Sequence, residues 1–202
     1  MVRVKICGIT SLEDAVAAIE AGADALGFLF TEGPRHVSLE KAQEIISEIP
    51  AFVSRVGVFA NAPLETVQKA IEACSLDHVQ LHGQEPPQFC EVLGNRAIKA
   101  FRVKDKSIIH QIMWYPVIHI LLDARDEAGD ASGLRHAWRV ARGLRHEYRV
   151  ILGGGLTPEN VTKAVSFARP WAVDVATGVE LRPGIKDPKK MRAFIHRAKQ
   201  IE

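Results

Sequence analysis

Short β-branched runs alternate with helical patterns along the whole chain, and this alternation constrains the fold more than any other feature. Each run is followed by apolar residues at the three- and four-residue spacing of a helix. We expect strands at 2–6, 25–30, 52–59, 78–81, 97–103, 117–122, 149–152 and 172–175. Alternating strands and helices imply parallel strands with right-handed crossovers, and eight pairs in one domain predict a closed (β/α)8 barrel of the TIM type.

Residues typical of helix ends support this division. Ser11 precedes the first helical pattern and Gly22 follows it, while Pro63, Thr157-Pro158 and Asp187-Pro188 open later ones. At 202 residues the chain is near the lower size limit of such a barrel, so we expect one α/β domain over residues 1–202 without a linker or lid domain. An open flavodoxin-like sheet is the alternative.

Composition excludes several classes of protein. Lys and Arg number 26 against 24 Asp and Glu, so no overall field favours nucleic acid or an acidic membrane. No apolar run approaches the roughly 18 residues of a membrane span. The three cysteines, at positions 7, 74 and 90, form neither a disulfide framework nor a zinc motif, so we expect no metal and a cytoplasmic location.

Polar residues follow most of the predicted strands, where active sites of this fold lie. The residues in question are Cys7, 30–35, Asn61, His82, Arg102, Asp123, 153–155 and 174–178. Gly153-Gly154-Gly155 after the seventh strand and Ala176-Thr177-Gly178 after the eighth predict a phosphate site made of backbone N–H groups. A tight turn alone would also explain the glycines. Neither segment is a GxGxxG or Walker A sequence, so no dinucleotide or ATP is expected.

Two of these residues are candidates for acid–base chemistry. Cys7 ends the first strand and is the candidate base or nucleophile, although a small buried hydrophobic residue is the alternative. An unperturbed thiol, with a pKa of about 8.5, is mostly protonated at neutral pH, so catalysis requires a nearby positive group. Asp123 ends the sixth strand and is the candidate acid, provided that its carboxyl stays protonated; a solvated loop acid is the alternative. Ionisation of the two groups would be coupled.

Two further side chains are candidates for substrate binding, and Arg35 opposite the glycine segments would suit a substrate with anionic groups at both ends. Arg35, after the second strand, offers a planar fork for a carboxylate, although it could be an ordinary surface arginine. His82 could donate a hydrogen bond or relay a proton, and a structural role is equally compatible with its position.

The motifs together resemble those of the phosphoribosylanthranilate isomerases of tryptophan biosynthesis, in the same order and over essentially the whole chain. The matching segments are KICGIT (5–10), GF (27–28), RVGVF (55–59), VQLHG (79–83), LLD (121–123), GGLTPENV (154–161) and VDVATGVE (173–180). The combination is specific, although no single motif is.

This resemblance implies an Amadori rearrangement that needs no cofactor and no metal. N-(5-phosphoribosyl)anthranilate would become 1-(2-carboxyphenylamino)-1-deoxyribulose 5-phosphate, with Asp123 as the acid that opens the ribose ring and Cys7 as the base at C2. Arg35 would hold the anthranilate carboxylate, and Asp174 would reach the sugar hydroxyls. The phosphate would be held by Gly154, Gly155, Thr177 and Gly178. The partner is thus a small phosphosugar, and the chain itself could be a monomer or a homodimer.

One segment departs from the family pattern. Where the family usually has Gly-Ser/Thr-Gly followed by Phe-Asp-Trp, this chain has DASGLRHAW at 130–138, in which His136 and Ala137 replace the aromatic residue and the acid. The segment follows Asp123, so it could change turnover or substrate range. Two alternatives remain: the histidine-pathway isomerase, which has an aspartate where this chain has Cys7, and a phosphosugar-binding barrel that has lost activity.

Overall fold

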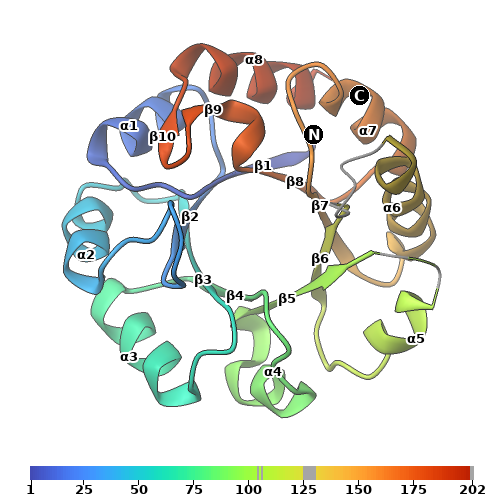
Figure 1. Cartoon of the computed structure of the whole chain (residues 1–202), viewed down its shortest axis with the longest axis horizontal. Coiled ribbons are helices and arrows are strands. Elements are labelled where there is room, and N and C mark those ends of the chain that lie inside the picture. Colours follow the sequence, from blue (N-terminus) through green and yellow to red (C-terminus); the bar gives the residue numbers. More distant parts are fainter. Residues whose placement is uncertain (104, 106, 125–130, 201–202) are drawn as a thin grey trace.

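The computed structural model describes residues 1–103, 105, 107–124 and 131–200, with only the backbone at 131–133. Eight parallel strands close into a barrel in chain order (Figure 1). They are β1 (Arg3–Cys7), β2 (Ala25–Leu29), β3 (Ser54–Phe59), β4 (His78–Leu81), β5 (Ala97–Arg102), β6 (His119–Asp123), β7 (Arg149–Gly153) and β8 (Ala172–Val175). Because β1 pairs in parallel with both β2 and β8, the barrel prediction is confirmed and the open sheet is excluded.

In the described part of the chain, eight α-helices surround the strands as an outer ring (Figure 1). They are α1 (Leu12–Glu20), α2 (Leu39–Ser47), α3 (Leu64–Cys74), α4 (Pro87–Leu93), α5 (Ile108–Ile112), α6 (Ala131–Leu144), α7 (Val161–Ala168) and α8 (Pro188–Lys199). Two of the predicted boundary residues act as side-chain caps: Ser11 Oγ accepts from Asp14 N at 3.1 Å, and Asp187 Oδ1 accepts from Lys189 N at 2.9 Å. These caps satisfy N–H groups that the first turn leaves without helical partners. The prediction at Thr157-Pro158 was wrong by one turn, since the N-cap of α7 is Asn160.

The segment between β8 and α8 contains structure that the sequence patterns did not predict. A short 3-10 helix, η2 (Thr177–Val179), leads into a hairpin of β9 (Glu180–Arg182) and β10 (Ile185–Lys186). Gly184 turns the hairpin with φ +83°, and its carbonyl accepts from Thr10 Oγ1 at 2.6 Å. A second 3-10 helix, η1 (Gly94–Arg96), follows α4. Such short elements carry too few residues for a hydrophobic period to register.

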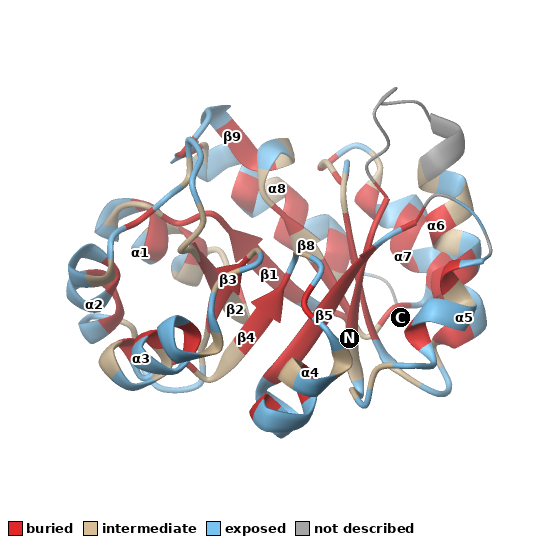
Figure 2. Ribbon diagram, turned by 60° about the horizontal axis from the view of Figure 1, so that its bottom comes forward, coloured by how far each residue is buried: buried red, intermediate tan, exposed pale blue. Residues whose placement is uncertain are grey.

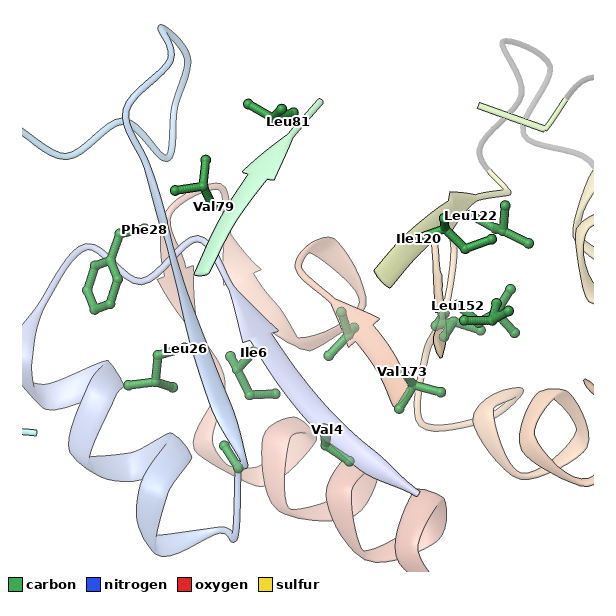
Figure 3. Packing of buried hydrophobic residues seen from close by; sticks show 14 of the residues in the cluster. Val4, Ile6, Leu26, Phe28, Val79, Leu81, Ile120, Leu122, Leu152 and Val173 are labelled. Carbon is green, nitrogen blue, oxygen red and sulfur yellow. The ribbon is translucent and has the colours of Figure 1, made fainter. Parts of the chain in front are cut away.

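Alternation along the strands divides the interior into two layers. Outward residues such as Val4, Ile6 and Leu26 pack between the strands and the helices (Figure 3). Inward residues fill the barrel, and the apolar ones form a separate cluster of Val56, Ile98, Ala100, Leu121, Ile151 and Ala172. Figure 2 shows that buried residues concentrate in the strands and on the inner faces of the helices. Every second residue of a strand therefore faces the barrel interior.

No helix within the described ranges is long and apolar enough to cross a membrane.

Candidate active site

A cavity opens at the carboxyl ends of the strands and collects nearly all of the predicted site residues. Its lining consists of Cys7, Leu29, Arg35, Val58, Gln80, His82, Arg102, Leu121, Asp123, Gly154, Gly155, Leu156, Asp174, Val175, Ala176 and Thr177. Eight of the nine predicted residues are in this set, and only Gly178 is not. Strand alternation explains the convergence, because Cys7, His82, Asp123 and Asp174 all lie on the inward face of their strands or just beyond it.

Cys7 is buried, with 6% of its surface exposed, and its thiol lies against the backbone of β2. A Cβ atom on Gly27 would come within 2.8 Å of Cys7 Sγ, so only glycine leaves room for the sulfur. Burial raises the pKa of Cys7, the Lys5 ammonium opposes this increase, and the Asp174 carboxylate adds to it. The balance favours the protonated thiol in the free protein.

Lys5 is the positive group that a catalytic Cys7 requires. It precedes Cys7 by two residues on the inward face of β1, and its Nζ lies 2.7 Å from Asp174 Oδ1 and 3.0 Å from Gln80 Oε1. Burial alone would lower the pKa of Lys5, but Asp174 and Cys7 raise it above its ordinary value. A permanent cation therefore lies beside the thiol and favours the thiolate.

Asp123 is also buried, with 6% of its surface exposed, and its Oδ2 lies 3.3 Å from His82 Nε2. The other ring nitrogen, His82 Nδ1, lies 2.9 Å from Gln80 Nε2. Polar contacts thus run across the mouth from Asp174 through Lys5, Gln80 and His82 to Asp123. They connect the strand that carries Cys7 to the strand that carries Asp123.

Arg35 is held by a bidentate ion pair to Glu180 on β9. Its Nε lies 2.8 Å from Glu180 Oε1 and its Nη2 lies 2.7 Å from Oε2. Lys186 completes the cluster, since its Nζ lies 2.9 Å from Glu180 Oε1 and 2.6 Å from the Cys7 carbonyl oxygen. Glu180 fixes the guanidinium plane, and three of its five N–H groups, two on Nη1 and one on Nη2, lie outside this pair and could bind an anion in the cavity that Arg35 lines.

The two glycine segments lie next to each other, as the sequence predicted. Gly154 and Gly155 have φ of +74° and +70°, a backbone conformation that favours glycine. Gly178 has a different reason to lack a side chain, because a Cβ there would collide with the Leu156 carbonyl oxygen. Gly178 therefore lets the segments after β7 and β8 approach closely, while Gly154, Gly155 and Thr177 face the cavity.

The segment that departs from the family pattern lies partly outside the described residues, which include neither 125–130 nor the side chains of 131–133. Farther along α6, Ala137 is fully buried, and Leu134 lies close to Gly155, where an added Cβ would come within 3.0 Å of Leu134 Cδ2. Buried His136 Nε2 and Trp138 Nε1 have no hydrogen-bond partner within the described part of the chain. Ala137, which replaces the acid of the family pattern, thus lies in the packed core, and its methyl group does not reach the cavity.

Sequence reasoning did not select Lys5, Gln80, Glu180 or Lys186. A signal was available for the first two, because they lie two residues before Cys7 and His82 and must face the same way on a strand. Buried polar residues on an inward face require partners, which marks them as part of a polar site. Glu180 and Lys186 belong to the hairpin that was not predicted. Glu180 ends the matching segment VDVATGVE, but no pattern connected it to Arg35 or Lys186. Among the described residues no group of three or more His, Cys, Asp or Glu could hold a metal ion.

Buried ionisable groups at the carboxyl ends of barrel strands, next to glycine segments after the last two, define the class: a single-domain (β/α)8 enzyme of acid–base type. The particular family follows from comparison with known proteins. The model of the N-(5'phosphoribosyl)anthranilate (PRA) isomerase family matches residues 4–197, and the chain belongs to this family.

Relatives agree with this assignment over their full lengths. The N-(5'-phosphoribosyl)anthranilate isomerase of Geobacter sulfurreducens is 53% identical over 201 residues, covering 98% of this chain and 99% of that protein. The crystal structure of phosphoribosyl anthranilate isomerase from Thermotoga maritima has a TM-score of 0.90 at 41% identity, with both chains fully covered. Another structure of the isomerase, with reduced 1-(o-carboxyphenylamino)-1-deoxyribulose 5-phosphate bound, has a TM-score of 0.87 at 42% identity and the same coverage.

Proposed function

We propose that the chain converts N-(5-phosphoribosyl)anthranilate to 1-(2-carboxyphenylamino)-1-deoxyribulose 5-phosphate, a step of tryptophan biosynthesis, by general acid–base catalysis. The observation that carries this proposal is that Cys7 and Asp123 line one cavity, each with a polar neighbour suited to its role. Family membership supplies the substrate, and full-length coverage of the relatives supports transfer of the reaction to this chain.

Ring opening is assigned to Asp123 as the general acid. Its carboxyl donates a proton to the ribose ring oxygen while the C1–O bond breaks and the nitrogen lone pair forms the Schiff base. The carboxylate left behind would accept a hydrogen bond from His82 Nε2, which lies 3.3 Å away. Asp123 is positioned for this role because it lines the cavity at the carboxyl end of β6.

Rearrangement is assigned to Cys7 as the general base. The thiolate removes the proton from C2, the C–H electrons form the C1–C2 double bond, and the electrons of the C=N bond return to nitrogen to give an enolamine. Tautomerisation then places a proton on C1 and leaves the ketone at C2, so atoms and charge balance without an oxidant or reductant. Lys5 supports the thiolate in this step. Because each step moves only protons and electron pairs within the substrate, the proposal requires no cofactor and no metal.

The remaining site residues are assigned to binding. Arg35, fixed by Glu180, would hold the anthranilate carboxylate, and Asp174 would accept hydrogen bonds from the sugar hydroxyls. The phosphate would lie against the backbone of Gly154, Gly155, Thr177 and Gly178, with Gly178 bringing the two segments together.

The test is consumption of phosphoribosylanthranilate by the purified protein, followed by the loss of substrate fluorescence. Cys7→Ser and Asp123→Asn are each expected to lower kcat by about 10²- to 10⁴-fold, the usual contribution of one acid or base. Cys74→Ser and Asp77→Asn, which change the same residue types away from the cavity, are the matched controls and should retain turnover. Retained turnover in both site variants would remove the mechanism.

The same assay separates the alternatives. Full-rate catalysis of the histidine-pathway substrate would indicate a broader enzyme, which Cys7 argues against, since that isomerase uses an aspartate at this position. Binding of substrate without turnover would indicate a barrel that has lost activity. We further propose a cytoplasmic protein that acts on a small phosphosugar, with no nucleic-acid partner, as a monomer or homodimer; light scattering of the purified chain decides between these two states.

A further inference from the structure

Gln80 is a buried amide at the centre of the polar contacts across the barrel mouth. Its residue surface is 1% exposed, and it lies on the inward face of β4. Its Oε1 lies 3.0 Å from Lys5 Nζ, and its Nε2 lies 2.9 Å from His82 Nδ1. One amide thus joins the cation on β1 to the imidazole that contacts Asp123.

Lys5 determines which way this amide points. A lysine ammonium can only donate hydrogen bonds, so the group of Gln80 that faces it must be the carbonyl oxygen. The –NH₂ group then has to face His82, and it can only donate. The orientation of the Gln80 side chain is therefore dictated by a neighbour that has no alternative hydrogen-bonding role.

The orientation of Gln80 in turn determines where His82 carries its proton. An Nδ1 atom that accepts from the Gln80 amide has no proton of its own, so the neutral ring must carry its proton on Nε2. Nε2 is the atom 3.3 Å from Asp123 Oδ2. The ring consequently presents an N–H to the carboxyl, and a doubly protonated imidazolium would place two donors face to face at Nδ1.

We propose that Gln80 is a positioning residue that, oriented by Lys5, holds His82 in the neutral Nε2–H tautomer and so directs an N–H at Asp123. This inference deepens the proposed function, on which its catalytic consequence rests. An imidazolium beside Asp123 would hold the carboxyl as a carboxylate, which cannot act as an acid. The opposite tautomer would present a lone pair, which cannot stabilise the carboxylate left after proton transfer.

The first test reads the tautomer directly and does not depend on turnover. In the full chain with ¹⁵N-labelled histidine, His82 is expected to show an unprotonated Nδ1 and a protonated Nε2. In Gln80→Glu the new carboxylate can only accept, so the proton is expected on Nδ1. Gln68→Glu, at an exposed position on α3, is the matched control and should leave the His82 signals unchanged. A protonated Nδ1 in the unsubstituted chain would overturn the proposal whatever the activity.

The second test asks whether Gln80 acts through His82. Gln80→Glu is expected to lower kcat by about 10- to 100-fold with little change in KM, a smaller loss than that of the acid itself. His82→Gln removes the ring and its tautomers, so in this background the remaining rate should be insensitive to Gln80→Glu, whatever His82→Gln itself costs. Equal losses from Gln80→Glu in both backgrounds would show that Gln80 acts elsewhere and would overturn the proposal.

Discussion

The two ends of the barrel interior are lined by the same strands but have opposite properties. β4 begins with His78 and leads to His82, while β6 begins with His119 and ends with Asp123. At the carboxyl end both nitrogens of His82 have polar partners. At the amino end, within the described part of the chain, neither His78 Nδ1 nor His119 Nδ1 has a hydrogen-bond partner. The position of an inward histidine on its strand therefore decides whether it belongs to the polar contacts at the carboxyl end or to the aromatic rings at the amino end.

The amino end is lined by aromatic rings that pack at a tilt. The ring centroid of His119 lies 5.7 Å from that of His78 and 5.4 Å from that of Trp171. The guanidinium carbon of Arg3 lies 4.5 Å from the Trp171 centroid. Burial lowers the pKa of His119, and neighbouring His78 and Arg149 lower it further. This end is thus organised for packing of rings, which contributes to stability and not to chemistry.

Removing the Lys5 charge is expected to have the largest effect, and only at the carboxyl end. Because Lys5 lowers the pKa of Cys7, Lys5→Met should raise it further and move the rise of kcat/KM with pH to higher pH. Each additional pKa unit lowers the thiolate fraction at neutral pH about tenfold. The pH–rate profile measures this shift, and Lys5→Arg, which retains the charge, is the control. An unshifted profile in Lys5→Met would mean that the thiolate is not the base.

Substitution of His119 should change acid stability without changing the rate. The folded protein holds this group at a pKa below that of the unfolded chain, so its contribution to stability is present above pH of about 6.5 and is lost as pH falls towards the folded value. His119→Phe should narrow the difference in Tm between pH 7.5 and pH 5.5, measured by thermal unfolding. His146→Phe, at an exposed position, is the control. Equal acid sensitivity in both variants would contradict this reading of the amino end.

The smallest effect is expected from Arg3, on the rim of the amino end. Arg3→Gln removes the cation from the Trp171 face, an interaction worth about 0.5–1 kcal/mol at exposed sites. In a chain of this size that corresponds to a decrease in Tm of about 1–4 °C. Thermal unfolding and the turnover assay together test it: a small decrease in Tm with unchanged kcat is expected, and a large loss of kcat would break the division between the two ends.

Sequence patterns predicted the barrel because the apolar residues of both its strands and its helices follow clear patterns. Buried parallel strands read as short apolar runs, and the helices carry one apolar face, so the eight strand positions agree with the structure to within two residues. The β9–β10 hairpin was missed because Glu180–Arg182 and Ile185–Lys186 are too short to show alternation and are held by side-chain contacts from distant segments. Those contacts depend on tertiary packing, which local patterns do not contain.

The site was predictable to a similar degree. The rule that barrel chemistry follows the strands selected Cys7, Asp123 and the glycine segments without any coordinates. It did not select Gln80 and Lys5, which lie inside strands and matter because of the side chains they meet across the barrel. Nor did it reveal why residue 178 is glycine. The reason is that the Leu156 carbonyl oxygen lies against it, a contact between two separate segments.

The ion pair between Lys5 and Asp174 joins residues that are 169 positions apart, on the first and last strands of the ring. β8 must therefore be synthesised before Lys5, the cation next to the thiol on β1, has its partner Asp174 in place. Contacts so distant along the chain form late and slowly in folding. The rate at which turnover recovers after dilution from denaturant would therefore report when the barrel closes, separately from the formation of helices. A fragment that lacks β1 or β8 would be inactive until it is mixed with a fragment that supplies the missing strand.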